Sequence, residues 1–209
     1  MIEFYTANTP NGWKVSILLE ELAMPYNTHV ISLSGDQFKP SFLEISPNNK
    51  IPAIVDPDGP DGKPISVFES AAILMYLARK AKSPLLPLDE RGFITTMQWV
   101  FFQMASVGPM LGQMGHFRRF AKEKIPYAID RYTEESKRIL GVMNTQLGKT
   151  TYLAGADYSI ADIATIGWIT AADRMFEGLD PWPHVKRWVD TVTARPAVKK
   201  GLAVPAAQT

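Results

Sequence analysis

The residues with the clearest chemical potential lie between Ile51 and Ser70. Glu69 and Ser70 fall at an expected helix start, where a carboxylate and a hydroxyl would lie beside the backbone N–H groups of a first helical turn. This corner could hold both charged ends of an amino acid, with Glu69 binding the ammonium and Ser70, together with the helix N-terminus, binding the carboxylate. A cis bond before Pro52 would turn the Ile51 backbone outward, where it could pair with an extended peptide. An edge strand followed by an ordinary helix cap is the alternative interpretation of both features.

The order of these features resembles the glutathione-binding half of the glutathione transferases. Residues 49–54, Asn-Lys-Ile-Pro-Ala-Ile, are followed by Glu69-Ser70 and by an apolar helix that ends in Tyr76-Leu77. In that family the backbone before a cis-proline pairs with the cysteinyl part of glutathione, and a Glu/Gln-Ser pair holds its γ-glutamyl end. The resemblance covers roughly residues 1 to 205. It is strongest to the nu class, through the strings at residues 9–12, 45–50 and 125–132.

A thiol held at this corner needs donors that stabilise its thiolate. The reference thiol pKa is near 8.5, so lowering it by roughly two units takes about 2.7 kcal/mol, which one or two well-aimed donors can supply. The loop at residues 6–12 leads into a helix whose N-terminus favours anions, so the Thr9 hydroxyl and the Asn11 amide or side chain are the candidate catalytic donors. By resemblance, this loop is where the family carries its thiol-activating Tyr, Ser or Cys. Tyr5 is the rival, but it lies in an alternating apolar run and we expect it to pack.

The resemblance also implies the other contacts with glutathione, the co-substrate in its reduced or disulfide form. Gln37 is the one residue of the loop at residues 35–38 that resembles a family ligand contact. Arg131 lies one turn into a helix that starts at Pro126, and its planar guanidinium suits a ligand carboxylate, although a solvated arginine is the commoner case. The implied binding residues are Asn11, Gln37, Lys50, Ile51, Glu69, Ser70 and Arg131.

Composition excludes several other kinds of chemistry. The chain of 209 residues contains no cysteine, so a disulfide framework, a thiolate metal site and a protein thiol nucleophile are all ruled out. His29, His116 and His184 are scattered without ligand spacing, so we expect no metal. The net charge is +1 and the charges are interspersed, which argues against a nucleic-acid or membrane partner. No leader or membrane-spanning pattern is visible, so the cytoplasm is the expected location.

The elements that must position these residues predict an α/β domain followed by an all-α domain. Strand, helix and strand alternate over residues 2–33, and a hairpin and a helix follow to Arg79. This β-α-β then β-β-α order is thioredoxin-like, and we assign it to residues 1–81. Pro84 and Pro87 mark a linker, and residues 89–205 read as helices throughout, which gives the glutathione transferase architecture.

Three features of the helical part bear on function. Gly108-Pro109 should kink or break the first long helix. Met104, Met110 and Met114 near this kink could line a pocket for a second substrate or simply fill the core. Ser159 and Asp162 form a capping box, so we assign them to folding and not to hydrolysis.

Three functions from different classes remain: a glutathione-dependent disulfide reductase, a transferase that conjugates glutathione to electrophiles, and a non-catalytic binding or regulatory protein on the same fold. Resemblance to the nu class implies two glutathiones, or glutathione disulfide, at each site. Two thiols side by side suit disulfide exchange, because one attacks a small disulfide substrate and the other resolves the mixed disulfide. The non-catalytic interpretation is disfavoured, because a fold kept only for packing need not retain all of the residues that match the family: Thr9, Asn11, Ile51-Pro52, Glu69-Ser70 and Arg131. A homodimer is the expected assembly.

Overall fold

The computed structural model describes residues 1–206 of the chain. Its internal contacts divide the chain into two compact units. The first contains Met1–Leu86 together with the segment from Ala194 onward, and the second is Pro87–Thr193. The domain limits expected from the sequence, 1–81 and 89–205, stay a prediction.

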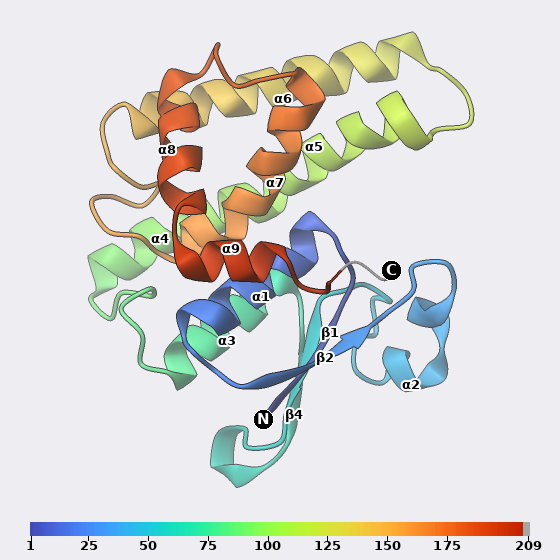
Figure 1. Cartoon of the computed structure of the whole chain (residues 1–209), viewed down its shortest axis with the longest axis vertical. Helices are drawn as coiled ribbons and strands as arrows, with labels where there is room; N and C mark the ends of the chain where they lie inside the picture. Colours follow the sequence, from blue (N-terminus) through green and yellow to red (C-terminus); the bar gives the residue numbers. More distant parts are fainter. Residues whose placement is uncertain (207–209) are drawn as a thin grey trace. The chain divides into compact units, whose positions relative to one another are not determined.

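The first unit is built on a four-stranded sheet with the order β2-β1-β3-β4 (Figure 1). β1 (Ile2–Thr6) pairs in parallel with β2 (Tyr26–Val30) and antiparallel with β3 (Ala53–Asp56), and β3 pairs antiparallel with β4 (Ile65–Phe68). A parallel pair joined through a helix, followed by a hairpin and a closing helix, is the predicted thioredoxin-like arrangement. That part of the fold prediction is confirmed.

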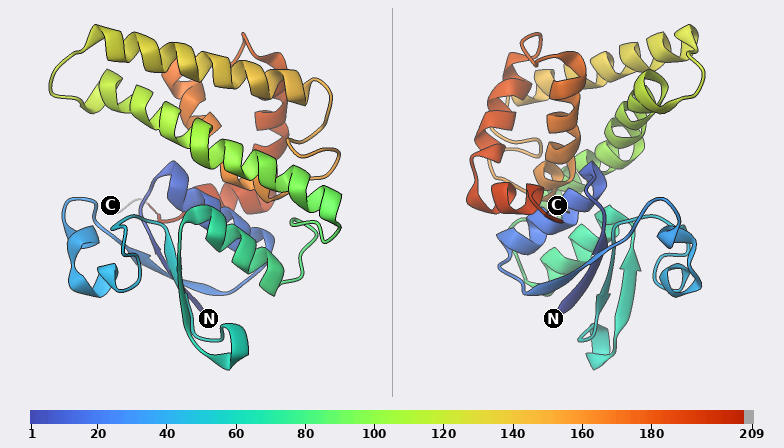
Figure 2. Two further views of the ribbon diagram at one scale, coloured as in Figure 1. Left: turned by 180° about the vertical axis from the view of Figure 1, so that it is seen from behind. Right: turned by 45° about the vertical axis from the view of Figure 1, so that its right-hand side comes forward.

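Helices cover both faces of this sheet. Alternate residues of β1 are buried, and α1 and α3 pack against each other. Tyr5 points to the other face of the sheet, where its ring centroid lies 6.2 Å from that of Phe42 in α2. Figure 2 shows α1 and α3 on one side of the sheet and α2 on the other. The helices are α1 (Pro10–Glu21), α2 (Pro40–Leu43), α3 (Ser70–Lys80) and α9 (Pro196–Leu202), with 3₁₀ turns at Asp36–Phe38 and Pro60–Gly62.

The last helix of the first unit, α9, lies directly against α1. The Ser16 hydroxyl donates to the carbonyl of Gly201 at 2.7 Å, and Arg195 makes a bidentate pair with Glu21. A Cβ on Gly201 would come within 2.5 Å of the Ile17 Cα, so only glycine allows this approach. Sequence reasoning placed this helix in the second domain by its helical pattern alone.

The second unit is entirely helical. The predicted break near Gly108-Pro109 takes the form of a π-helical turn, Gln103–Val107, which joins α4 to α5. On α4, Met97 and Val100 are buried, whereas Phe101 is 60% exposed. The elements are α4 (Glu90–Phe102), α5 (Gly108–Gly115), a second π turn (His116–Phe120), α6 (Pro126–Leu147), α7 (Ile160–Phe176) and α8 (Pro183–Thr193).

The capping box at the start of α7 is present as predicted. One Asp162 carboxylate oxygen accepts from the backbone N–H and the hydroxyl of Ser159, and the other accepts from the Leu153 N–H and from Trp188 Nε1. Burial is the main effect on the Asp162 carboxyl and raises its pKa, while these four donors oppose the rise. Ser159 and Asp162 therefore tie three segments of the helical unit together, which supports a structural role.

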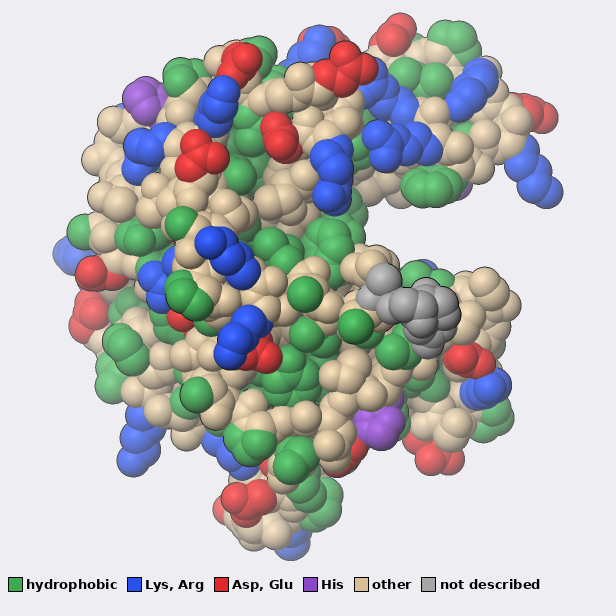
Figure 3. All heavy atoms as spheres, viewed as in Figure 1, with side chains coloured by type: hydrophobic (Ala, Val, Ile, Leu, Met, Phe, Trp, Pro, Cys, Tyr) green, Lys and Arg blue, Asp and Glu red, His purple; other side chains and the backbone are tan. Residues whose placement is uncertain are grey.

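Two further observations concern partners. Within residues 1–206, no helix is long and apolar enough to cross a membrane, and no group of His, Cys, Asp or Glu side chains could hold a metal ion. On the face drawn in Figure 3, the Lys and Arg side chains are interspersed with acidic and apolar ones. This distribution agrees with the mixed charge pattern of the sequence.

Candidate active site

The strand register brings three separate chain segments to one edge of the sheet. Tyr5 pairs with Ala53, and Ala53 pairs with Phe68, so the end of β1, the start of β3 and the end of β4 are neighbours. The residues that follow β1, precede β3 and follow β4 must therefore emerge close together. These segments carry Thr9, Ile51 and Glu69, which the sequence separates by tens of positions.

Thr9 ends the loop after β1 and caps α1. Its backbone is extended, with φ −142° and ψ 158°, and its Oγ1 accepts from the Gly12 N–H at 3.3 Å. Pro10 then occupies the first helical position, which suits its fixed φ and its missing N–H. The loop is thus shorter than the predicted 6–12, and Asn11 lies in the first turn of α1. Thr9 Oγ1 is the acceptor in its hydrogen bond with the Gly12 N–H, so the Thr9 hydroxyl can still donate a hydrogen bond to a ligand.

Gly12 fixes how closely this turn approaches β1. A Cβ at Gly12 would lie 2.3 Å from Oγ1 of Thr6 and 2.5 Å from the carbonyl oxygen of Ala7. Such distances cannot be relieved by a small side-chain movement, because one of the two atoms belongs to the backbone. The glycine therefore sets the position of Thr9 and Asn11 relative to the sheet edge.

The segment before β3 presents its backbone at the same edge. The Ile51–Pro52 peptide bond is cis, as predicted. The Ser46 hydroxyl donates to the carbonyl of Lys50 at 2.8 Å and so holds the chain just before Ile51. The Ile51 side chain is half-buried, while the Lys50 side chain is exposed.

Glu69 precedes α3 in an unusual conformation. Its backbone angles, φ 68° and ψ 113°, lie outside the regions that residues other than glycine normally adopt. Its carboxylate makes no capping hydrogen bond to α3. Strain of this kind costs about 1 to 3 kcal/mol and is concentrated at functional sites. Glu69 is exposed, whereas Ser70 beside it is 6% exposed. At the start of α3, the Glu69 carboxylate is therefore open to solvent, whereas the Ser70 hydroxyl is buried.

Sequence reasoning missed one charged residue here, Lys14 of α1. Its side chain is 2% exposed, and its Nζ donates to Oγ of Ser70 at 3.3 Å. Burial lowers the pKa of the Lys14 ammonium to about 7, and the nearby Glu69 carboxylate opposes the change. The available signal was its position next to Val15 and four residues before Leu18, on the apolar face of the helix.

Gln37 and Tyr5 have local partners in the structure. The Gln37 side chain accepts from the Gly35 N–H and donates to the Leu33 carbonyl, which closes the turn after β2. Tyr5 stacks on His29 with ring centroids 4.6 Å apart, and burial, with a smaller effect of the Glu3 charge, raises its pKa. A raised pKa and a stacked ring agree with the packing role expected of Tyr5.

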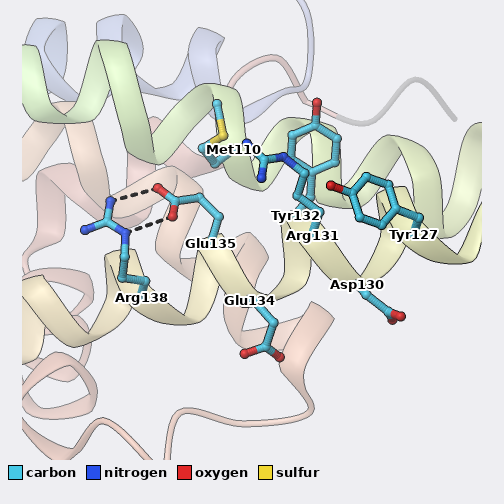
Figure 4. A pocket seen from close by; sticks show the side chains of 8 residues that line it. All are labelled: Met110, Tyr127, Asp130, Arg131, Tyr132, Glu134, Glu135 and Arg138. Carbon is cyan, nitrogen blue, oxygen red and sulfur yellow. Dashed lines mark hydrogen bonds and ion pairs between the residues drawn. The ribbon is translucent and has the colours of Figure 1, made fainter.

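Arg131 belongs to the second unit, where it is exposed and lines a pocket of about 740 Å³ on α6. In Figure 4 its guanidinium lies near Met110 of α5, while Glu135 and Arg138 form a bidentate ion pair along the same helix. That pair lowers the pKa of Glu135, and the charge of Arg131 adds a smaller effect. Of the methionines near the kink, Met110 reaches this pocket, whereas Met114 is fully buried and fills the core. The complete lining is Met110, Tyr127, Asp130, Arg131, Tyr132, Glu134, Glu135 and Arg138.

Both parts of the chain match models of one family. Residues 9–80 match the glutathione S-transferase N-terminal domain, and residues 105–196 match the glutathione S-transferase C-terminal domain. The chain therefore belongs to the glutathione S-transferase family, as its sequence motifs predict.

Individual relatives narrow the comparison. The disulfide-bond oxidoreductase YfcG of Escherichia coli K12 is 47% identical over 204 residues, which cover 97% of this chain and 94% of the relative. A glutathione transferase from Burkholderia graminis, solved with two glutathione molecules bound per subunit, has a TM-score of 0.93 at 45% identity, and the match covers 99% of this chain and 89% of the solved chain. One from Pseudomonas putida, with one glutathione disulfide per subunit, has a TM-score of 0.92 at 43% identity, and the match covers 98% of this chain and 92% of the solved chain. These matches confirm the predicted fold class and the nu-class resemblance.

Proposed function

We infer that this chain is a glutathione-dependent disulfide-bond oxidoreductase of the nu class, with glutathione as its co-substrate. The observation that carries the inference is the meeting of the segments with Thr9, Ile51 and Glu69 at one sheet edge, in a chain without any cysteine. A redox enzyme of this kind must take both reacting sulfurs from bound glutathione. The similarity to YfcG over nearly the whole chain supports this reaction, and the neighbours with two glutathiones or one glutathione disulfide support the stoichiometry.

The sheet edge of the first unit provides the proposed site for one glutathione. The Ile51 backbone pairs with the cysteinyl part, Glu69 binds the α-ammonium group and Ser70 binds the α-carboxylate. Thr9 and Asn11 donate to the sulfur and favour its thiolate, since α1 directs the positive end of its dipole to this point. Gln37 and Lys50 of the same unit are assigned to the remaining polar groups of this ligand. Arg131 is assigned to a ligand carboxylate by the family resemblance.

The proposed reaction is a pair of thiol–disulfide exchanges. The first glutathione thiolate attacks one sulfur of the substrate disulfide, forms a mixed disulfide and releases the other sulfur as a thiolate that takes a proton. The thiolate of a second glutathione then attacks the glutathione sulfur of the mixed disulfide. This step releases the second substrate thiol and leaves glutathione disulfide. Holding both thiols in one site makes the second step effectively intramolecular.

A paired assay tests this function. We expect the protein to reduce small disulfides with glutathione faster than it conjugates halo-nitroaromatic compounds. Pretreatment with a thiol-alkylating reagent, removed before the assay, should leave the activity unchanged because the chain has no thiol to modify. Faster conjugation than reduction would instead support the transferase alternative, and the absence of both activities would support a binding or regulatory protein.

Loss of either proposed charged contact should weaken ligand binding. We expect Glu69→Ala and Arg131→Ala each to reduce the affinity for glutathione or its disulfide by roughly 1 to 3 kcal/mol, the usual range for a hydrogen bond to a charged group. Titration calorimetry gives the affinities. Lys137→Ala is a matched control, since it removes an exposed positive charge from α6 that pairs with Glu134. Wild-type affinity in both site variants would place the ligand elsewhere.

We also propose that the protein is a cytoplasmic homodimer. Ile94 and Phe101 are 50% and 60% exposed and lie seven residues apart on α4, so they share one helix face. Exposed apolar residues on one face suit an interface, and two-fold pairing is the commonest symmetry of soluble oligomers. Light scattering at micromolar protein would give a monomer mass if this proposal were wrong.

A further inference from the structure

The loop between β1 and α1 is tied to a side chain of the helix that follows it. Trp13 of α1 donates its indole N–H to Oδ1 of Asn8 at 3.0 Å. An indole nitrogen can only donate, so the Asn8 amide must present its oxygen to Trp13. Asn8 immediately precedes Thr9, the proposed donor to the reacting sulfur. The hydrogen bond therefore fixes the residue next to a proposed catalytic group.

Backbone hydrogen bonds connect the position of Asn8 to that of Thr9. The Thr9 N–H donates to the Ala7 carbonyl at 2.8 Å, so the chain turns tightly around Asn8. The Trp13 N–H donates to the Thr9 carbonyl at 3.1 Å, and the Gly12 N–H donates to Thr9 Oγ1 at 3.3 Å. Trp13 thus holds Thr9 through its backbone and Asn8 through its side chain.

A hydroxyl that stabilises a thiolate must be oriented accurately. Hydrogen bonds weaken steeply as their angle departs from the optimum, and a misplacement of about 1 Å in an active site can lower a rate by about 100-fold. Asn8 is exposed, so packing does little to hold it and its position depends on hydrogen bonds. A small change in the loop at Asn8 would therefore reach the Thr9 hydroxyl.

We propose that Trp13 and Asn8 are positioning residues for Thr9, and that the hydrogen bond between their side chains orients the Thr9 hydroxyl toward the sulfur of bound glutathione. This inference rests on the proposed glutathione site. Neither Trp13 nor Asn8 needs to contact the ligand in this role. Without the hydrogen bond the fold is kept, but the loop samples more orientations and the hydroxyl stabilises the thiolate less.

Trp13→Phe tests this role, because phenylalanine keeps an aromatic ring and removes the indole N–H. We expect kcat for disulfide reduction at saturating glutathione to fall by about 3- to 10-fold at neutral pH. The pKa that governs kcat should also rise by about 0.5 to 1 unit, because a less stabilised thiolate holds its proton more tightly. Loss of folded protein would lower kcat equally at every pH and leave this pKa unchanged.

A double-mutant cycle shows whether the two side chains act through their hydrogen bond. Asn8→Ala removes the acceptor and should match Trp13→Phe in both kcat and its pKa, and the double variant should be no worse than either single variant. Asn8 is an exposed loop residue, so Asn8→Ala decides the matter if Trp13→Phe does not fold. Trp182→Phe is the matched control, since it changes a half-buried tryptophan of the second unit in the same way and should behave as wild type.

The same substitutions show whether the hydrogen bond acts through Thr9. In a Thr9→Val background there is no hydroxyl to orient, so adding Trp13→Phe should lower kcat no further. A further fall would overturn the positioning role. So would an unchanged pKa of kcat in both single variants, or effects of the two substitutions that simply add. If wild type shows no glutathione-dependent disulfide reduction, the proposed function itself fails and the inference falls with it.

Discussion

Thr9→Val is expected to lower the glutathione-dependent disulfide reductase activity by about 10- to 1000-fold, and Asn11→Ala by a similar factor. The reason is the loss of one hydrogen-bond donor to a sulfur that carries negative charge in the transition state. Valine keeps the branched shape of threonine and removes only the hydroxyl. Steady-state kinetics with a small disulfide at saturating glutathione measures the effect.

The structure shows that Thr9 also caps α1, so a second effect of the same variant must be separated. Losing the bond from the Gly12 N–H to Thr9 Oγ1 should cost about 1 kcal/mol of stability. Thr9→Ser keeps a hydroxyl for both tasks and should retain most of the activity. Kinetics should be measured where denaturation curves show every variant fully folded. Full activity in both Thr9→Val and Asn11→Ala would show that the catalytic loop is wrongly assigned.

Lys14→Met is expected to raise the free energy of unfolding by roughly 2 to 5 kcal/mol at pH 7. The wild-type lysine has an ordinary pKa of 10.5 when unfolded and about 7 when folded. Below pH 7 both states are protonated and the full cost of the buried charge is present. Between these two values the unfolded state binds more protons, so wild-type stability should rise with pH by about 1.4 kcal/mol per unit.

Denaturant unfolding between pH 7.5 and 9.5 measures this slope. Lys14→Met should lack the rise, and the difference between the two proteins should shrink as pH increases. The pH range ends below 10 because two tyrosines would also contribute there. Burial and, to a smaller extent, a carboxylate partner raise the pKa values of Tyr26 and Tyr76 in the folded protein. Their phenols would therefore ionise first in the unfolded state and lower the stability. Parallel pH profiles for wild type and Lys14→Met would mean that folding does not lower the pKa of Lys14.

Local sequence signals predicted most elements, and the errors have local physical causes. The second strand was expected to reach residue 33 but ends at Val30, since β1, with which it pairs, ends at the paired residue Thr6. The loop before α1 was expected to reach Gly12, although Thr9 followed by Pro10 is itself a cap and first-turn signal. Both errors concern where an element stops, which depends on pairing or on one cap.

The candidate site depends on information that no single segment carries. Glu69-Ser70 and Ile51-Pro52 are recognisable by residue type, but their meeting at one sheet edge follows from the strand register, which pairs Ala53 with Phe68. Lys14 was missed because a lysine in an amphipathic helix is normally solvated, and only the tertiary packing of α1 shows that this one is buried.

The close contact of Gly201 with Ile17 has a consequence for biosynthesis. Protein chains emerge from the ribosome from the N-terminus, so the sheet and α1 are made well before α9. Until the intervening helical segment has been translated, the side of α1 that carries Ser16 and Ile17 lacks its permanent cover. During this interval the uncovered side of α1 is accessible to chaperones and proteases, so synthesis of the second unit sets how long the first unit stays incomplete.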